Sequence, residues 1–431
     1  MTYRGMGLPS AFLSIALFMS SAAHAASYFG YINSAWRGND FFIQTASQTN
    51  VAWIQDISTA STVSDLQIAQ NNNQKAIIDV SYIFLAGNTL NPNYMAQWNA
   101  LVAAITPYQN TIAAFYPMDE PNGNQVLATS VGTAVSTIRT SFSTIPIAAI
   151  FSYPTSAATS YAPYVNYFDW VGIDCYSNGI FTCYGPSQAA VGYTIAYQLL
   201  KQNALQSQRL MLVPQVFVNV SQVGCCQAQL LHENSLFYAL AYGDPQVVGV
   251  FPFMLESFPL GTTPSFYGLS DASNVQLQYE SSVMGTNIRS GWTFPAGTAP
   301  IYRFTSASTG DHFFTANESE GVLASAANSF VFEGFGFVVY TSSSAGMNAL
   351  YRCNAGGVSH FLSSGSNCEG QVVEGLLGYT NSAQSANTAP LYRFFNTSNG
   401  SHLATTNYNE GVAAGLTPEY ILGFVPVVST P

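Results

Sequence analysis

The chain has 431 residues, of which 48% are hydrophobic and only 7% are charged, and its formal net charge is −11. This length exceeds one ordinary domain, and the hydrophobic content is enough for a large core. The acidic balance, with a sequence pI of about 4.7, argues against a nucleic acid or an anionic membrane as a partner. Because charged residues are so few, each carboxylate carries unusual weight.

The N-terminus has the pattern of a secretory signal peptide. Arg4 precedes an apolar run over Leu8–Met19, and small residues follow up to Ala25. The run is too short to span a bilayer comfortably, so we expect cleavage after Ala25. The mature protein is predicted to be a secreted, extracellular monomer without a membrane span.

Six cysteines in an exported chain predict disulfides. Cys353 and Cys368 lie close together in the C-terminal part and are expected to pair. The connectivity of the other four cysteines stays open; they are Cys175, Cys183, Cys225 and Cys226. A zinc site is the alternative, but it lacks a C-x-x-C pair and nearby histidines.

Between residues 26 and 285, short apolar runs alternate with segments of helical periodicity. The predicted strands are Tyr28–Asn33, Val51–Ile57, Ala76–Ser81, Ile112–Tyr116, Ile145–Phe151, Trp170–Asp174, Leu210–Val216 and Val247–Phe253. The predicted helices are Tyr94–Ile105, Val126–Ser141, Ser187–Leu205, Gln229–Tyr242 and Asn274–Met284. This α/β alternation predicts a (β/α)₈ TIM-type barrel. A doubly wound sheet is the alternative, but Gly30 alone does not supply its glycine-rich first turn.

Residues 286–299 are rich in small residues and are predicted to be a linker between two separately folding parts. Residues 300–431 contain a threefold repeat. Each unit has a Tyr-Arg pair, then a histidine, and then a closing glutamate: Tyr302, Arg303, His312 and Glu333; Tyr351, Arg352, His360 and Glu374; Tyr392, Arg393, His402 and Glu419. Three such units predict a small all-β, β-trefoil-like domain. The histidines either line binding pockets or hold the units together, and we favour the second role.

The C-terminal pattern resembles a family of repeats of unknown function found beside hydrolase domains in secreted bacterial proteins. The matching motifs are Tyr302-Arg303-Phe304 and Gly310-Asp311-His312-Phe313, and the middle unit departs from them because Cys353 replaces the phenylalanine. The family declares no ligand. We expect the domain to be an accessory module that binds a cell-wall or cell-surface glycan.

Reactive residues of a (β/α)₈ barrel lie at the C-terminal ends of its strands. The carboxylates expected at these ends are Asp56, Asp79, Asp119, Glu120, Asp174 and Glu256. Hydrolysis of a glycosidic bond needs one carboxyl group to protonate the leaving oxygen and a second as nucleophile or base, with no cofactor. The mature barrel has one histidine, His232, which leaves little material for a Ser-His-Asp triad or a metal site.

The strongest local signal is the segment FYPMDEPN, which ends the fourth predicted strand and contains Asp119, Glu120 and Pro121. Pro121 disfavours helical backbone at Glu120. The segment is similar to the Asn/Asp-Glu-Pro end of strand four in many retaining barrel glycoside hydrolases. That resemblance implies that Glu120 is the general acid/base and that Asp119 contacts the sugar. Without a catalytic role, the acids would cap a turn at a helix N-terminus.

Asp174, at the end of the sixth strand, is the second catalytic candidate; its alternative role is to orient Arg37 or Tyr176. The seventh strand departs from the retaining pattern, because Gln215 stands where that pattern often has a glutamate nucleophile. Either Asp174 or Glu256 then supplies the second carboxylate, or a 2-acetamido group of the substrate attacks with help from the paired acids on the fourth strand.

Aromatic side chains near the strand ends are candidates for stacking on sugar rings. The substrate-binding candidates are Trp36, Trp53, Tyr82, Tyr116, Tyr176, Gln215 and Glu256. Trp36 and Trp53 are the strongest of them, although any of these rings can equally belong to the core. The sequence therefore predicts a secreted glycoside hydrolase that acts on a poly- or oligosaccharide. The alternative is a non-catalytic, glycan-binding or adhesive protein on a degenerate barrel.

Overall fold

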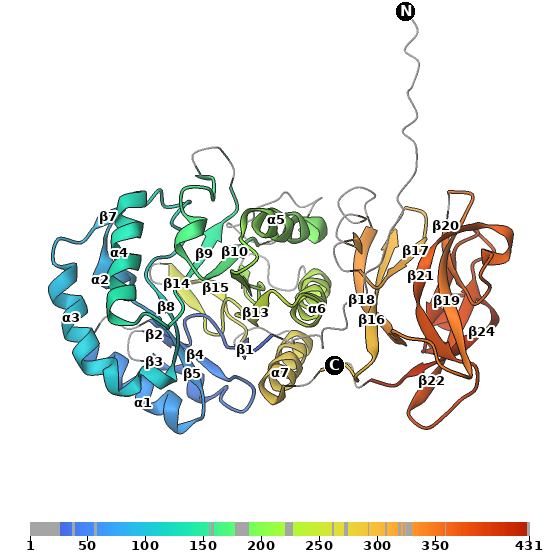
Figure 1. Cartoon of the computed structure of the whole chain (residues 1–431), viewed down its shortest axis with the longest axis horizontal. Helices are drawn as coiled ribbons and strands as arrows, with labels where there is room; N and C mark the ends of the chain where they lie inside the picture. The colour runs from blue at the N-terminus through green and yellow to red at the C-terminus, as the bar shows by residue number, and fades with distance from the viewer. Residues whose placement is uncertain are drawn as a thin grey trace, which may run out of the picture.

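The computed structural model describes residues 26–428 except 37–38, 56–57, 155, 157–158, 177–188, 220–226, 261–262, 271–274, 292, 307, 318–319, 322–323, 325–329 and 358. A mixed α/β part is followed by a part built mostly of strands (Figure 1). The predicted signal peptide, Arg37 and Asp56 lie outside the described residues. Within those residues, no helix has the length and apolarity needed to cross a membrane.

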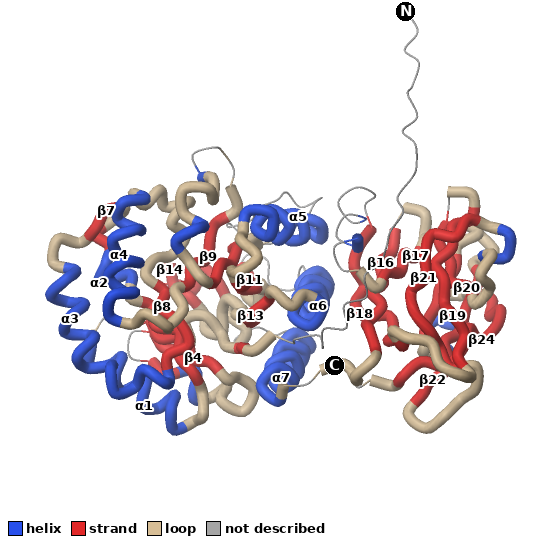
Figure 2. The backbone as a smooth tube through the Cα atoms, viewed as in Figure 1, coloured by secondary structure: helices blue, strands red, loops and turns tan. Residues whose placement is uncertain are grey.

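The N-terminal part is organised around parallel strands with helices on the outside (Figure 2). These strands are β1 (Tyr28–Phe29), β4 (Val51–Gln55), β5 (Lys75–Asp79), β8 (Ile112–Tyr116), β9 (Ala148–Ser152), β10 (Trp170–Asp174), β11 (Arg209–Leu212) and β13 (Val247–Val250). One sheet has the order β1-β13-β11-β10-β9. The other has the order β3-β2-β4-β5-β8 and includes the short strands β2 (Ala35–Trp36) and β3 (Asn39–Asp40).

Further hydrogen bonds join the two sheets at both ends. The backbone N–H of Asn50, just before β4, donates to the carbonyl of Phe29 in β1 over 3.0 Å. The N–H of Phe115 in β8 donates to the carbonyl of Pro146, just before β9, over 2.9 Å. Hydrogen bonding therefore connects the eight strands in chain order and returns from β13 to β1. All eight strands were predicted from the sequence, and the parallel α/β architecture is confirmed.

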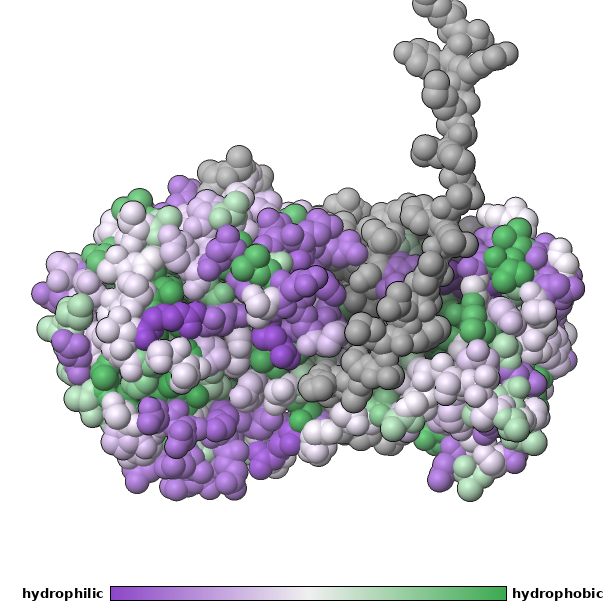
Figure 3. Space-filling view, in the orientation of Figure 1, coloured by the Kyte–Doolittle hydropathy of each residue, from purple (hydrophilic) through white to green (hydrophobic). Residues whose placement is uncertain are grey.

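The helices of this part pack against the strands through apolar residues. The helices are α1 (Thr59–Asn71), α2 (Ser81–Phe84), α3 (Tyr94–Ile105), α4 (Ala128–Ser141), α5 (Ala189–Asn203), α6 (Gln227–Gly243) and α7 (Val275–Ser290). In α3, the buried residues Trp98, Leu101 and Ile105 have the spacing of one helical face. On the side shown in Figure 3, hydrophilic residues cover much of the outer surface of this part.

Helix α7 extends five residues into the segment predicted to be a linker, and β16 begins at Thr298. The reason is a buried helical face that continues beyond the predicted end. Leu277, Met284 and Ile288 are each 1–2% exposed and lie on one side of the helix. The connection between the two parts is therefore shorter than the sequence predicts.

Alternate residues of each strand enter two different apolar cores, because side chains along a strand point to opposite faces. In β4, Ala52 and Ile54 pack with the helices, whereas Val51 and Trp53 belong to a second cluster made only of strands and the segments that follow them. We call this second cluster the inner core. Its members include Ile77, Tyr116, Ile150, Trp170, Met211, Val213, Val248 and Phe251.

Short strands outside the main sheets complete this part. The pair β6 (Leu85–Ala86) and β7 (Thr89–Leu90) forms a small hairpin, and β12 (Val218–Asn219), β14 (Phe258–Leu260) and β15 (Thr263–Tyr267) form an antiparallel sheet. Neither sheet was predicted from the sequence.

The C-terminal part consists of three similar antiparallel units. Their strands are β16 (Thr298–Ser306), β17 (His312–Thr315) and β18 (Phe330–Tyr340); β19 (Met347–Ala355), β20 (Ser359–Ser363) and β21 (Val372–Asn381); and β22 (Thr388–Phe395), β23 (His402–Thr405) and β24 (Thr417–Pro426). In each unit the first strand pairs with both others, and the register has irregularities at matching positions. The third unit also has a short helix, α9 (Tyr408–Ala413). The strand-rich antiparallel character is confirmed, and the trefoil assignment stays a prediction.

Three equivalent arginines tie the units together. Arg352 in the second unit forms an ion pair with Glu374 of its own unit over 2.7 Å and with Glu320 of the first unit over 2.6 Å. The matching pairs are Arg303 with Glu333 and Glu410, and Arg393 with Glu419 and Glu369. Each arginine thus binds its own unit and the preceding one around the set of three.

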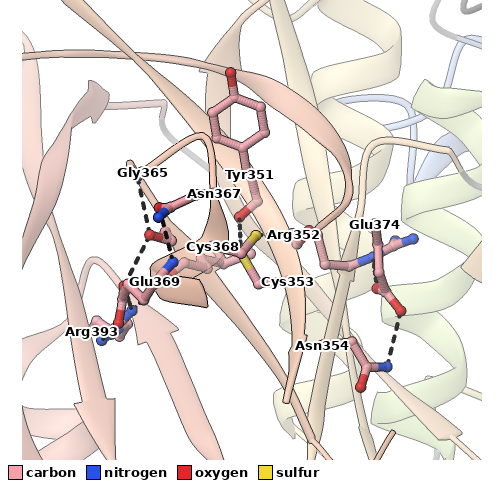
Figure 4. Close-up of a disulfide and its surroundings, with 12 residues drawn as sticks. Tyr351, Arg352, Cys353, Asn354, Gly365, Asn367, Cys368, Glu369, Glu374 and Arg393 are labelled. Atoms are coloured by element: carbon pink, nitrogen blue, oxygen red, sulfur yellow. Dashed lines mark hydrogen bonds and ion pairs between the residues drawn. A yellow bond between two sulfur atoms is a disulfide. The ribbon is translucent and has the colours of Figure 1, made fainter. Parts of the chain in front are cut away.

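The disulfide Cys353–Cys368 occupies the core of the second unit (Figure 4). In the other units, Phe304 and Phe394 stand at the position of Cys353. The Phe304 ring packs on Gly321, where an added Cβ would lie 2.2 Å from it, and the Phe394 ring packs on Gly411, where an added Cβ would lie 2.6 Å from it. The disulfide therefore takes the place of a phenylalanine ring packed on glycine. The predicted pairing is confirmed. Cys175 is also disulfide-bonded, and the other three cysteines lie outside the described residues.

The histidines of the repeats lie between units and beside glutamates. Nδ1 of His360 is 2.6 Å from the Asp311 carboxylate of the first unit, and its Nε2 is 3.5 Å from Glu374. Nδ1 of His312 lies 3.0 Å from the carbonyl oxygen of His402. These contacts favour the structural role over three open pockets.

An aromatic interface joins the two parts of the chain. Helix α6 lies against β18 (Figure 1), and Tyr238 of α6 contacts Phe335 of β18 with ring centroids 5.9 Å apart. Phe335 also contacts Phe294 and Tyr302. Gly243 ends α6 beside Tyr302, where an added Cβ would lie 1.7 Å from the tyrosine hydroxyl. The two parts therefore share one apolar core.

Candidate active site

The strand ends bring a group of acidic and polar side chains to one end of the inner core. Asp79 is the last residue of β5 and lies two positions after the inner-core residue Ile77. Asp174 is the last residue of β10 and lies four positions after the inner-core residue Trp170. The period of two along a strand therefore directs both carboxyl groups toward this core. Asp119 and Glu120 follow the end of β8. The negative charges of Asp119 and Glu120 both act on Asp174, so these three carboxyl groups lie near one another.

The segment after β8 holds its acids through specific hydrogen bonds. The hydroxyl of Tyr116 donates to Oδ1 of Asp119 over 2.5 Å. The backbone N–H of Glu120 donates to the carbonyl of Ile150 in β9 over 3.0 Å, and Glu120 has a φ of 41°. A positive φ is unfavourable for a residue with a Cβ. The surrounding contacts therefore fix the backbone at this acid in a demanding conformation.

Asn122 connects this segment to the end of β9. Its amide group donates to the carbonyls of Ser152 and Thr159 over 2.8 Å each, and its oxygen accepts from the N–H of Ser152. Asn122 is fully buried. At Gly123, an added Cβ would lie 2.3 Å from the Ser152 hydroxyl and 3.4 Å from Oε2 of Glu120. The Pro-Asn-Gly sequence after Glu120 thus supports the acid, a role that the sequence analysis missed.

Burial raises the pKa of Glu120 to about 7, and the nearby charge of Asp119 contributes to the increase. Burial also raises the pKa of Asp119, against the opposing effects of the Tyr116 hydroxyl and the Glu120 N–H. Taken as a whole residue, Asp119 is the most exposed of these acids, and its two hydrogen bonds favour its charged form. A pKa of about 7 leaves Glu120 about half protonated at neutral pH.

Asp174 has the most strongly perturbed carboxyl group of the three. Burial, followed by the charges of Asp119 and Glu120, raises its pKa well above the ordinary value, while a hydrogen bond from Tyr176 opposes the increase. Its Oδ1 atom is buried and has no hydrogen-bond partner among the described residues. This oxygen can accept a hydrogen bond from a ligand, because a buried acceptor without any hydrogen-bond partner is energetically unfavourable.

Asp79 extends the acidic group toward β4. It is 3% exposed, accepts from the N–H of Ser81 over 2.8 Å, and has a hydrogen bond with Gln55, the last residue of β4. Burial raises the pKa of Asp79 to about 6 despite these bonds, with a smaller effect from the charge of Asp119. The sequence did not single out Gln55 as a site residue, although its position at the end of a predicted strand indicates that it could lie beside these acids.

The basic side chains described in the N-terminal part bond elsewhere. Lys75 and Arg209, the first residues of their strands, donate to the carbonyls of Asn110 and of Gln246. The others bond to residues that precede strands: Arg139 to Asp169, Lys201 to Asp244 and Arg289 to the Thr49 carbonyl. Among the described residues, the positive charges therefore gather at the amino ends of the strands and the perturbed carboxyls at the carboxyl ends.

The predicted aromatic candidates are mostly buried. Trp53 is 2% exposed and packs between Tyr116 and Phe251 in the inner core. This placement does not support a stacking role for Trp53, since neighbouring rings fill the space around this inward-facing position. Tyr116 and Tyr176 are also buried but border the acids through hydrogen bonds. Tyr82, in α2, is half-buried.

The remaining candidates lie at or after the ends of other strands. Gln215 is 2% exposed, and its amide donates to the carbonyl of Phe217 over 3.1 Å. Glu256 lies six residues after the end of β13 and is half-buried. Trp36 belongs to β2, but its side chain and that of His232 lie outside the described residues.

Several solved structures are similar to the chain at low identity. One is a glycoside hydrolase family 5 mannosidase from Rhizomucor miehei, with 8% identity and a TM-score of 0.44; the match covers 63% of this chain and 95% of that chain. Another is xylanase A from P. fluorescens subsp. cellulosa, with 12% identity and a TM-score of 0.43; the match covers 62% of this chain and 99% of that chain. A GH2 β-galacturonidase from Eisenbergiella tayi has 9% identity and a TM-score of 0.41, and it covers 56% of this chain. The match extends over only 46% of the galacturonidase.

Sequence comparisons give one family for the C-terminal part. Residues 270–380 and 366–422 match a domain of unknown function, DUF5648. No curated protein matches the chain.

Proposed function

We propose that the protein is a secreted glycoside hydrolase whose catalytic site lies at the carboxyl end of a (β/α)₈ barrel. The observation that carries this proposal is the group of Asp119, Glu120 and Asp174, which lie close enough to influence one another's ionisation. A pair of carboxyl groups with separated roles is what glycosidic hydrolysis requires. Perturbed acids in one place are also typical of catalytic sites.

The barrel is supported by the hydrogen bonding of the strands and by the inner core. The strands are connected in chain order from β1 to β13 and back to β1, whereas a doubly wound sheet would leave two edge strands. Strands of both sheets contribute the side chains of one face to the inner core, as the strands of a barrel do to its filled interior.

In this proposal Glu120 is the general acid/base. A pKa of about 7 leaves a substantial protonated fraction at neutral pH, so Glu120 can protonate the leaving oxygen. Asp174 is the second carboxyl group, and Asp119, fixed by Tyr116, contacts the sugar. Two routes use this arrangement. In the first, Asp174 itself attacks, which requires that this carboxyl group first lose the proton that its burial and the charges of Asp119 and Glu120 favour. In the second, a 2-acetamido group of the substrate attacks while the acids orient it.

A non-catalytic glycan-binding barrel is the second candidate. Gln215 favours it, because this side chain follows β11 and bonds to a neighbouring carbonyl where a catalytic glutamate is common in retaining enzymes. The glycan-binding role of the repeats likewise stays a proposal and does not depend on which candidate holds.

The test is hydrolysis of a panel of neutral and acetamido-bearing poly- and oligosaccharides by the whole mature chain. Hydrolysis is measured by the release of reducing ends. Glu120→Gln keeps the shape of the side chain and removes its proton, so the rate should fall by a factor of about 10² or more. Asp174→Asn should reduce the rate similarly. Glu280→Gln, on helix α7, is the matched control and should leave the rate unchanged. Full activity of a folded Glu120→Gln variant would exclude the assigned role, and glycan binding without any hydrolysis would favour the second candidate.

A further inference from the structure

The first repeat shows how a unit of this domain binds an α-helix. In its sheet, Tyr302 stands opposite Phe335. Both residues face helix α6, where Tyr238 and Gly243 contact them. The contact leaves Tyr302 only 2% exposed. One repeat therefore uses a paired tyrosine and phenylalanine on neighbouring strands as a helix-binding face.

The equivalent positions of the other two repeats are more exposed. Tyr351 stands opposite Leu376 in the second unit, and Tyr392 stands opposite Ile421 in the third. Leu376 is 37% exposed and Ile421 is 45% exposed. The two tyrosines are only half-buried. The equivalence is structural, since the three units share the same pairing and the same irregularities in register.

Further apolar side chains enlarge both positions. We define the second-repeat face as Leu376 with Val373, which stands opposite Cys353 on the same side of the sheet as Tyr351 and is 44% exposed. The third-repeat face consists of Ile421, Tyr408 and Val412, which are 43–52% exposed. Figure 3 shows hydrophobic residues on the surface of this part of the molecule. Grouped exposure of this kind is typical of interaction surfaces.

We propose that these two faces dock an amphipathic α-helix with aromatic side chains, supplied by another protein chain. The first repeat already binds such a helix through equivalent residues, so its occupant is the guide to the others. Helix α6 of a second copy does not suffice, because β18 of that copy covers it. A sugar is less suited to the second-repeat face, because its most exposed residues are aliphatic and its aromatic ring, Tyr351, is half-buried. The net charge of −11 favours basic residues at the flanks of the partner helix.

The probe is a fluorescently labelled, hydrocarbon-stapled peptide with the sequence of residues 227–243, which form α6. Binding to the whole mature chain is measured by fluorescence anisotropy and isothermal titration calorimetry. We expect two sites per chain. Leu376→Ser should abolish one site and Ile421→Ser the other, each with at least a tenfold loss of affinity. A peptide carrying Tyr238→Ser and Tyr242→Ser should bind at least tenfold more weakly.

Further variants distinguish helix docking from dimerisation and from glycan binding. Ile43→Ser, at a 47% exposed position of the N-terminal part, should leave both sites intact, and Val373→Ser provides a second probe of the second-repeat face. Absence of peptide binding, or binding that survives in the Leu376→Ser/Ile421→Ser double variant, would overturn the proposal. Concentration-dependent dimerisation without peptide that is lost in Leu376→Ser would assign the face to a second copy instead. Loss of polysaccharide binding in the same variants would assign it to a glycan.

Discussion

Arg303, in the first repeat, forms an ion pair with Glu410 of the third repeat over a distance of 2.7 Å. The equivalent arginines of the second and third repeats each reach back to the unit before them. The contact between the first and last units therefore closes the set of interactions. Because each arginine depends on a neighbouring unit, we expect the three repeats to unfold together.

Replacing one of these arginines should destabilise the whole C-terminal part. Arg352 is the clearest case, since its side chain is 9% exposed and binds Glu320, Glu374 and the Phe314 carbonyl. Arg352→Gln leaves two carboxylates without their cation, and the free energy of unfolding should fall by about 2 kcal/mol. Thermal and denaturant unfolding measure this loss.

The matched control is Arg139→Gln in the N-terminal part. Arg139 and Asp169 form an ion pair whose side chains are 38% and 37% exposed, so the loss should be about 0.5 kcal/mol. Equal effects of the two substitutions would contradict the structural importance of the Arg352 contacts.

The repeats should lose stability in acid through Glu374. Although burial opposes the change, His360 and Arg352 lower the pKa of Glu374 to about 2. A carboxyl group whose pKa is lower in the folded state stabilises the fold above its ordinary pKa of 4.5, and this contribution is lost as the pH falls toward about 2. Glu374→Gln should flatten the pH dependence of the unfolding free energy over this range. An unchanged slope would show that Glu374 is not the responsible group.

The pH dependence of hydrolysis should follow Glu120. Burial and the charge of Asp119 raise its pKa to about 7, so an acid catalyst at this position loses its proton above that pH. The value of kcat/KM should therefore decline about tenfold per pH unit on the alkaline side. Initial rates between pH 5 and 9 on the best substrate of the panel test this. A rate that stays constant to pH 9 would exclude Glu120 as the acid.

The sequence predicted the strands well because each is a short, continuous apolar run. It missed helix α1, which is rich in serine and threonine and begins with a Ser58 cap: the Ser61 N–H donates to the Ser58 hydroxyl. Serine and threonine side chains that form local hydrogen bonds with the backbone contribute little to the hydrophobic periodicity by which a helix is predicted. The carboxylates of the site were visible from their position after strands. Asn122 was not, since its partners, the carbonyls of Ser152 and Thr159, are distant in sequence.

The aromatic candidates show a second limit. Trp53 was chosen for its position near a strand end, but that position faces the inner core, where Tyr116 lies with ring centroids 4.9 Å away. Nearness to a strand end does not reveal whether a side chain lies below the site or lines it. The burial of Trp53 depends on rings from β8 and from the segment after β13, which the sequence of β4 does not contain.

The disulfide of the second repeat should provide measurable stability. Cys353 and Cys368 are separated by 15 residues, and closing a loop of this length stabilises a fold by about 3 kcal/mol. The double variant Cys353→Ala/Cys368→Ala should lose about this amount or more, because both side chains are fully buried. Chemical denaturation under oxidising conditions measures the difference. A loss below about 1 kcal/mol would contradict the view that the disulfide replaces the phenylalanine core of the other repeats.

The last prediction concerns how firmly the two parts are joined. The linker expected from the sequence predicts separate folding, but the aromatic interface between α6 and β18 predicts coupling. Phe335→Ser removes the ring that contacts Tyr238, Phe294 and Tyr302. The variant should unfold in two separated calorimetric transitions, with a total loss of about 2–3 kcal/mol.

Leu376→Ser is the internal control for this prediction, because Leu376 occupies the equivalent position in the second repeat and is 37% exposed. Its substitution should change the unfolding free energy by no more than about 0.5 kcal/mol. A chain that ends at Gly285 should aggregate, since it lacks Ile288, which is 2% exposed in the complete chain, and uncovers Tyr238. A soluble, cooperatively folding fragment of this length, together with equal effects of the two serine substitutions, would show that the parts are independent and that the interface contributes little to stability.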